Sequence, residues 1–264
     1  FGRGSLAGAI GRKDWLLRVR DPRQLVNLLG GGLIAIVAFA LVIFRGSGDE
    51  GSLADLATQG NVELPAAFAF FAAAFSPGII AAVWALFIGV VFLMTPANFA
   101  LAQEGSAFSL LKAAPIRSGE VWWAKMWSVF LPYLILFSLA LVLSWLPLRY
   151  SLAWLPYGLA AGWLYGHGIL ASNLAAGFRF ANLNWTDPRR MTTRGGGLVA
   201  LLIMLIYSIV AGIVVYTPYG LASVGPQWSI PLALGGLLVL ALLTWLWDRI
   251  MSRWALKAWD YLPA

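Results

Sequence analysis

The chain has 264 residues, of which 61% are hydrophobic and only 11% are charged, whereas roughly a quarter of the residues in a soluble domain are charged. This composition excludes an ordinary soluble domain and predicts an integral membrane protein. The net charge of +7 does not indicate nucleic-acid binding, because the basic residues stand at the ends of apolar runs rather than in one patch. The sequence has no cysteine, which excludes disulfides, thiolate metal sites and a cysteine nucleophile.

The first predicted element is a cytoplasmic interfacial helix within residues 1–24. Trp15 and its apolar neighbours alternate with basic residues, which favours a helix lying in the plane of the lipid headgroups. Asp21 and Pro22 then form an N-cap followed by proline at the first helical position, which predicts the start of the next helix. A simple positively charged anchor explains the segment equally well. The sequence starts at Phe1, and we expect it to be a piece of a longer polypeptide.

Residues 25–264 are predicted to form an all-α transmembrane domain with a cytoplasmic tail. Long runs without charged residues meet or exceed the roughly 20 residues that a helix needs to cross a bilayer. The second charge-free run, which contains Pro77, is long enough to form any of three structures. These are a helix kinked at Pro77, an interfacial piece followed by a span, or a two-pass hairpin. The last run divides at the Thr217–Gly220 turn signal. The six predicted spans are 25–44, 66–99, 124–146, 152–178, 196–217 and 229–249.

The distribution of lysine and arginine predicts the orientation of these spans. Sixteen of the eighteen basic residues fall on one face of the six-span arrangement, and only Arg45 and Arg149 fall on the other. Because loops rich in lysine and arginine stay in the cytoplasm, both termini are predicted to be cytoplasmic.

The segment between the second and third spans is the most distinctive polar stretch. Residues 106–114 predict a short helix that Pro115 ends, and Ser118 is placed to cap the next helix. A helix of this length is not stable alone in water, so it must dock on the lipid surface, on the spans or on a partner. An interfacial connector without a partner remains an equal alternative.

The fourth predicted span contains His167, the intramembrane ionisable residue that we single out as a functional candidate. Gly158, Gly162 and Gly166 recur every four residues, which predicts that another helix backbone approaches this face closely. His167 is expected to be packed and hydrogen-bonded, with haem or chlorophyll ligation as the alternative. The lack of acidic residues within the spans argues against a carrier with a carboxylate relay. Milder polar groups are expected to form interhelical hydrogen bonds, and they are Asn98, Ser172, Asn173 and Tyr207.

The segment before the fifth span repeats the earlier pattern. Asp187, Pro188 and Arg189 predict another short helix, which the Gly195–Gly197 run ends. No G-x-x-x-x-G-K-[ST] sequence occurs in the chain, so no nucleotide site is expected within it.

Three stretches, in this order, resemble the permease subunits of ABC-2-type exporters. They are KDWLLRVRDPRQL near the N-terminus, EGSAFSLLKAAPIRSGEVWWAKM after the second span and NWTDPRRMTTRGGG before the fifth. Within that family the chain looks most like a group of ABC exporters whose permease often joins two six-span halves, and it would match the second half. The resemblance implies an ABC-2-like fold in a prokaryotic plasma membrane.

The resemblance also implies the partners. A separate ABC ATPase would carry ATP and magnesium, so this chain would hold no cofactor and would not itself be an enzyme. A second permease half or an identical chain would complete the transporter. The resemblance places the ATPase-coupling helix at Glu104, Gly105, Phe108, Leu111, Lys112 and Pro115. It places the connecting helix beside the ATPase at Trp15, Arg20, Asp21 and Arg23.

Two other functions remain open from the sequence. One is a structural or pigment- or haem-binding subunit of a larger membrane complex, which would use His167. The other is a membrane-embedded enzyme, which has little support because no carboxylates cluster near the single histidine. The sequence does not predict the substrate or the oligomeric state.

Overall fold

The computed structural model describes residues 6–20, 77–89, 94–145, 152–186, 190–193, 195–222 and 229–262. The regular secondary structure of this part is helical, apart from one isolated antiparallel bridge between Ala181 and Thr192. The elements are α1 (Leu6–Arg20), α5 (Pro77–Ile88), α6 (Met94–Phe99), the 3-10 helix η2 (Ala102–Ala107), α7 (Phe108–Ala113), α8 (Ser118–Trp145), the 3-10 helix η3 (Leu152–Trp154), α9 (Leu155–Arg179), α10 (Gly196–Ala222) and α11 (Ser229–Trp259).

Three of the described helices, α8, α10 and α11, are long and apolar enough to cross a membrane. At a rise of 1.5 Å per residue, even 20 residues extend for about 30 Å, the thickness of the hydrocarbon core. Their qualifying segments are Ser118–Leu143, Gly196–Val215 and Ile230–Trp259, which overlap three of the predicted spans. The predicted span at 25–44 lies outside the described residues.

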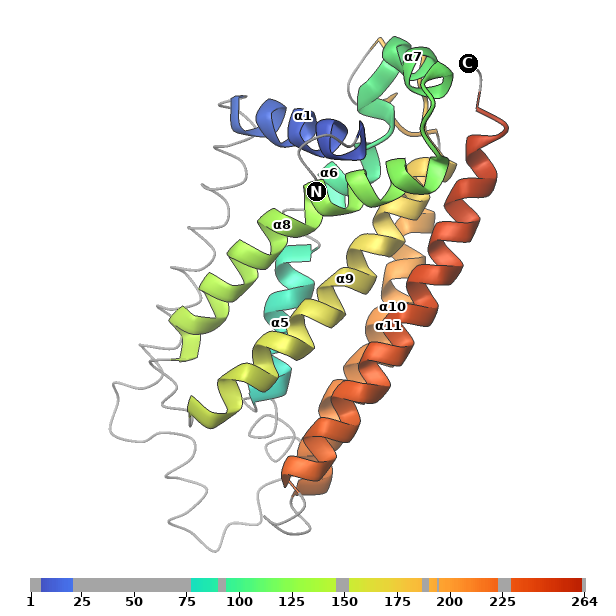
Figure 1. Cartoon of the computed structure of the whole chain (residues 1–264). Coiled ribbons are helices and arrows are strands. Elements are labelled where there is room, and N and C mark those ends of the chain that lie inside the picture. The colour runs from blue at the N-terminus through green and yellow to red at the C-terminus, as the bar shows by residue number, and fades with distance from the viewer. Residues whose placement is uncertain are drawn as a thin grey trace, which may run out of the picture.

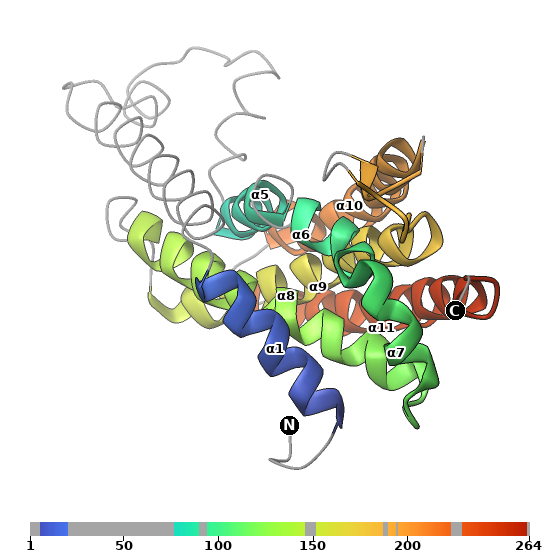
Figure 2. The ribbon, with the colours of Figure 1, turned by 90° about the horizontal axis from the view of Figure 1, so that it is seen from above.

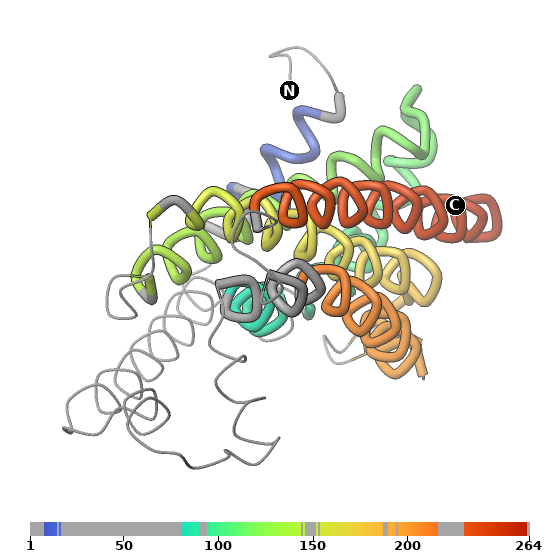
Figure 3. The backbone as a smooth tube through the Cα atoms, turned by 90° about the horizontal axis from the view of Figure 1, so that it is seen from below, coloured from blue at the N-terminus to red at the C-terminus, as the bar shows by residue number. Residues whose placement is uncertain are grey.

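Helix α9 lies at the centre of the described bundle (Figures 1 and 3). It packs against α11 on one side and against α10 and α5 on the other, with α8 also in contact. Every residue from Gly168 to Phe178 is buried. Helix α9 is long enough for the predicted span at 152–178, but it is not among the three helices that qualify by apolarity. Its surface meets other helices, so glycine, alanine and polar side chains replace the large apolar residues that lipid contact favours.

Within the predicted span at 66–99 the structure describes the helices α5 and α6. Helix α5 is described from Pro77, and residues 90–93 between α5 and α6 lie outside the described residues. The interfacial piece that one of the three interpretations places before Pro77 lies outside the described residues. Helix α6 touches α9 closely, because a Cβ atom added at Gly177 would lie 2.4 Å from the carbonyl oxygen of Asn98. Gly177 is therefore a position where two backbones meet.

Helix α11 continues to Trp259, ten residues beyond the predicted end of the span at residue 249, so the first part of the predicted tail is helical. Arg249, Arg253 and Lys257 recur every four residues and are all exposed. Met251 on the other side of the helix is buried. The charged residues therefore mark one face of an amphipathic continuation and do not end the helix.

The segment between α9 and α10 folds back on itself. The amide of Asn182 donates to the carbonyl of Met191 at 2.9 Å, and that of Thr193 donates to the carbonyl of Phe180 at 2.9 Å. The predicted start of the next helix at residues 187–189 lies outside the described residues, but its expected continuation to Gly195 was wrong, because Thr192 forms the bridge with Ala181 and Gly196 already belongs to α10. Gly195 has a φ of +89°, a conformation that glycine adopts readily, and α10 begins directly after it.

Helices α1 and α7 lie at the same end of the bundle as the C-terminal end of α11 (Figure 1). Seen from that end, α1 crosses over α8 and α7 lies beside the end of α11 (Figure 2). The segments predicted to share one membrane face thus lie together, while the side of the membrane they occupy stays a prediction.

The outer faces of α10 and α11 carry many large exposed apolar side chains, which in a bilayer would face lipid. They include Leu198, Leu202, Ile206, Ile209 and Ile213 on α10 and Ile230, Leu234, Leu238, Leu242 and Leu246 on α11.

Candidate functional site

Two polar features distinguish the described bundle, and the first is a charge cluster made of Lys13, Asp14, Glu104 and Lys125, in which the side chain of Lys13 is exposed and the other three are buried. The ammonium group of Lys125 in α8 is almost completely buried, at 1% exposure. It lies 2.8 Å from the carboxylate of Asp14 in α1 and also contacts the carboxylate of Glu104 in η2. Lys13 in α1 lies 2.7 Å from Glu104. The cluster joins three elements that are far apart in the sequence.

The charges in this cluster balance, with two ammonium groups facing two carboxylates. Removing one member of a buried ion pair leaves an uncompensated charge, which is strongly destabilising. The arrangement therefore holds α1 and η2 against the start of α8.

Glu104 is the member that accepts hydrogen bonds from both lysines. Burial alone would raise the pKa of its carboxyl group, but the charges and hydrogen bonds of Lys125 and Lys13 outweigh burial and hold the pKa below its ordinary value. Glu104 is therefore ionised throughout the physiological pH range, and its negative charge helps to hold α1, η2 and α8 together.

The backbone beside Glu104 is held from a second direction. Gly105 lies within η2 and has a φ of +50°, so the chain turns sharply inside this element, three residues before α7 begins. The indole Nε1 of Trp185 donates a hydrogen bond of 2.8 Å to the carbonyl oxygen of Ala102. The segment after α9 thus fixes the start of η2, and a side chain larger than hydrogen at Gly105 would be strained.

Helix α7 is attached to the end of α11. Phe108 is 1% exposed, and its ring lies edge-on to that of Trp259, with centroids 5.0 Å apart. Lys112 donates a hydrogen bond of 2.6 Å to the carbonyl oxygen of Leu262. Although α7 has only six residues, these tertiary contacts stabilise it.

The structure places the predicted coupling residues in different environments. Phe108 is buried, and Glu104 is held in the charge cluster. Leu111 is half-buried, and Pro115 is exposed. Leu110, which the prediction did not include, is the large apolar side chain that α7 exposes, at 74%. A partner that touches α7 would meet Leu110 rather than Phe108.

The predicted connecting-helix residues are only partly described. Trp15 and Arg20 belong to α1, where the structure describes their backbone, and Asp21 and Arg23 lie outside the described residues. The residues through which α1 is held, Lys13 and Asp14, were not predicted.

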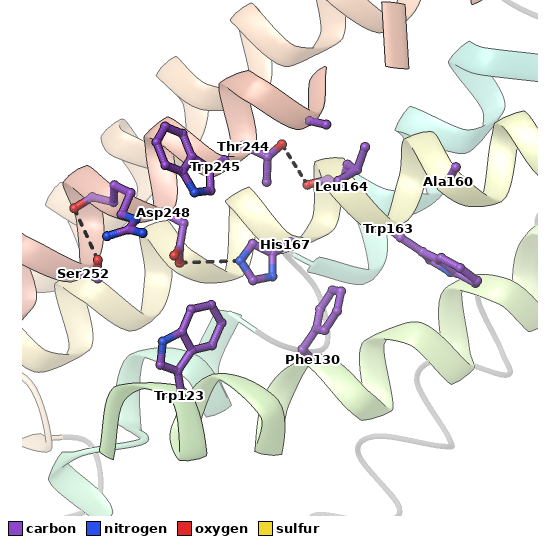
Figure 4. A pocket seen from close by; sticks show the side chains of 12 residues that line it. Trp123, Phe130, Ala160, Trp163, Leu164, His167, Thr244, Trp245, Asp248 and Ser252 are labelled. Atoms are coloured by element: carbon purple, nitrogen blue, oxygen red, sulfur yellow. Dashed lines mark hydrogen bonds and ion pairs between the residues drawn. The ribbon is translucent and has the colours of Figure 1, made fainter. Parts of the chain in front are cut away.

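The second polar feature is a groove between α8 and α11 with α9 as its floor, called the α8–α11 groove below (Figure 4). It has a volume of about 720 Å³. Helix α8 contributes Trp123 and Phe130, α9 contributes Ala160, Trp163, Leu164 and His167, and α11 contributes Ala241, Thr244, Trp245, Asp248, Arg249 and Ser252.

His167 faces a carboxylate in this groove. Its Nε2 lies 3.5 Å from Oδ1 of Asp248, a residue that is 8% exposed. This contact lacks hydrogen-bond geometry, so Oδ1 has no hydrogen-bond partner among the described residues. The expectation that the spans lack acidic residues was wrong, because Asp248 lies within the apolar helix α11 and faces His167.

Aromatic rings surround this pair. The ring of Trp123 is stacked on His167 with centroids 6.3 Å apart, and Phe130 meets it edge-on at 5.1 Å. At the rim, the guanidinium of Arg249 lies 5.3 Å from the ring centroid of Trp245. The groove therefore combines a buried carboxylate, an arginine and several aromatic faces.

The glycine stripe of α9 receives aromatic rings and not another helix backbone, so that prediction was wrong. A Cβ atom at Gly162 would lie 1.9 Å from the ring of Phe137, and one at Gly166 would lie 1.9 Å from the ring of Tyr133. At Gly158 the nearest atoms, from Leu141 and Trp145, are 3.3 Å away. The stripe thus makes room for bulky side chains of α8.

Polar side chains connect α9 to its neighbours. The hydroxyl of Tyr207 donates to the carbonyl of Leu164 at 3.2 Å and lies 2.9 Å from Oγ1 of Thr244. Trp247 Nε1 donates to Ser172 Oγ at 2.8 Å. Asn173 bonds instead within α9, to the carbonyl of Ile169, and Asn98 Oδ1 has no hydrogen-bond partner in the described ranges.

Within the part of the chain that the structure describes, no group of three or more histidine or acidic side chains is placed to hold a metal ion. No family model matches the chain, and no curated protein or solved structure matches it.

Proposed function

We propose that this chain is the membrane-spanning permease subunit of an ABC exporter and that it couples ATP hydrolysis on a separate ATPase subunit to export. The observation that carries the proposal is the way α7 is mounted. It lies at one end of the bundle, exposes Leu110, and is attached to α11 through Phe108 and Trp259. A partner that moves α7 would therefore also move a long helix that is apolar enough to span the membrane.

The charge cluster supports the same function. A ligand shifts a conformational equilibrium only through interactions that differ between the states, so ATP binding on a partner needs a stiff connection to the spans. Lys125 ties η2 and α1 to the first turns of α8. In this proposal α1 is the connecting helix and α7 the coupling helix, and a second permease half or an identical chain completes the transporter.

The experiment is a comparison of two exposed leucines. The permease is co-expressed with each candidate ABC ATPase subunit from the same genome, and ATPase co-purification and substrate-stimulated ATP hydrolysis are measured. Leu110→Asp is expected to weaken the association by about tenfold or more, as central interface residues do. Leu152→Asp, at a 70% exposed leucine in η3, is the control and should leave both readings unchanged.

Wild-type association and coupling in the Leu110→Asp variant would refute the docking role of α7. Phe108→Asp is not a suitable probe, because it would place a charge in a buried site and disturb the fold.

A haem- or pigment-binding subunit has less support. Nε2 of His167, the atom that would ligate a metal, faces Asp248, and Trp123 and Phe130 lie against the ring. A macrocycle would have to displace these side chains to reach the imidazole.

A further inference from the structure

The carboxylate of Asp248 is the first element of the inference. It is 8% exposed, lines the α8–α11 groove, and its Oδ1 has no hydrogen-bond partner among the described residues. A buried carboxylate is stable only when charges and hydrogen bonds compensate it. His167 at 3.5 Å provides a contact but no hydrogen bond, and Oδ1 itself is enclosed by protein atoms. The side chain of Asp248 is still 11% exposed and lines the groove, so a donor in the groove would bind the other oxygen of the carboxylate.

The groove walls beside Asp248 suit a cationic donor. Trp123, Phe130 and Trp245 present aromatic rings to the groove, and aromatic faces attract ammonium groups. An ammonium group in this position would gain both a charged hydrogen-bond acceptor and aromatic contacts.

The opposite charge lies on the next residue of α11. Arg249 is exposed and its guanidinium lies over the ring of Trp245, 5.3 Å from the centroid. The planar guanidinium binds phosphate with two parallel hydrogen bonds, which makes arginine well suited to this anion. A purely anionic ligand would be repelled by Asp248, and a purely cationic one by Arg249.

The groove becomes apolar away from these charges. Helices α9 and α11 run in the same direction, so their earlier residues lie farther from the end that carries α7 (Figure 1). The groove residues on that side are Ala160, Trp163, Leu164 and Ala241. Its volume of about 720 Å³ is in the range of small-molecule sites, and its polarity changes along its length as it does in an amphiphile.

We infer that the α8–α11 groove binds an amphiphile whose head carries an ammonium group next to a phosphate, the headgroup chemistry of phosphatidylethanolamine. The ammonium group binds Asp248, the phosphate binds Arg249, and the chains lie along the apolar end. This inference rests on the proposed function and names the substrate class of the exporter.

The test measures lipid binding to the purified full chain in detergent. Radiolabelled dioleoyl-phosphatidylethanolamine is the probe, and unlabelled phosphatidylglycerol and the cationic lipid dioleoyl-trimethylammonium-propane are competitors. Saturable binding of the probe is expected, with both competitors about tenfold weaker or more. Asp248→Asn should weaken binding of the probe by about tenfold to a hundredfold, because the ammonium group would then donate to a neutral amide oxygen instead of a carboxylate.

Two further variants keep the test decisive. Arg249→Gln changes an exposed side chain, so folding should be preserved, and it should reduce binding of the probe while improving competition by the cationic lipid. Arg253→Gln alters a neighbouring exposed arginine that does not line the groove, and it should leave binding unchanged. The inference is overturned if the probe shows no saturable binding, if phosphatidylglycerol competes equally well, or if Asp248→Asn and Arg249→Gln both bind as wild type does.

A transport assay separates this inference from the proposed function. Proteoliposomes with the ATPase and a fluorescent phosphatidylethanolamine report ATP-driven movement between leaflets. Binding without any ATP-driven transport or ATPase association would keep the groove assignment and refute the exporter. ATPase coupling that depends on Leu110, with no lipid binding, would do the reverse.

Discussion

The charge cluster and the α8–α11 groove both bury carboxylates near basic groups, but only the cluster pairs them completely. Lys125 touches two carboxylates at once, and Glu104 touches two lysines. In the groove, Asp248 has a histidine at 3.5 Å and no hydrogen bond to Oδ1 within the described residues. This difference indicates that the charge cluster holds helices together, and we call it the joint below. The groove instead has the properties of a recognition site.

The largest expected effect comes from breaking the joint. Lys125→Met should lower the free energy of unfolding by about 3–5 kcal/mol, because it leaves two buried carboxylates facing one lysine. Denaturant titration in micelles measures the effect, and Lys257→Met on the exposed face of α11 is the matched control. Similar small losses in both variants would show that the cluster does not act as a joint.

The joint should also make the stability of the protein depend on pH. Since the folded pKa of Glu104 lies below its ordinary value of 4.5, this stabilisation is complete above that value and is lost as pH falls through the lower folded pKa. Glu104→Gln should lower stability at neutral pH by about 1–3 kcal/mol, the usual contribution of hydrogen bonds to charged groups. Melting temperatures between pH 3 and 7 measure both effects, and a wild-type profile in the Gln variant would assign the acid sensitivity to other groups.

The smallest expected effect on stability comes from the groove. Asp248→Asn should change the free energy of unfolding by less than about 1 kcal/mol, because the contact with His167 is loose and no hydrogen bond of Oδ1 is lost. The same denaturant titration checks this prediction. A loss as large as that of Lys125→Met would mean that the His167–Asp248 pair is a second joint, and the contrast between the two regions would fail.

The positions of several helices followed from the sequence because the bilayer imposes a simple length rule. Charge-free runs predicted helices near α8, α10 and α11, and Pro115 was placed correctly between α7 and α8. The prediction ended the last span near residue 249 because the charged residues beyond Trp247 were interpreted as lying outside the membrane. They alternate with buried residues such as Met251, so the helix continues with one polar face.

The site was less predictable because its partners are distant in the sequence. Lys125 was counted only as a marker of topology, and no spacing rule connects it to Lys13 or Asp14 in α1. The glycine stripe correctly indicated a tightly packed face, but glycine creates space without identifying what fills it. Here the rings of Tyr133 and Phe137 fill it.

The contact between Phe108 and Trp259 has a mechanical consequence. It fastens α7 to the far end of the helix that forms one wall of the groove. Asp248 lies eleven residues before Trp259, about 16 Å along the helix axis at 1.5 Å per residue. In the exporter that we propose, α11 would work as a lever, and a motor pressing on α7 would tilt this wall and loosen or tighten the grip on the cargo.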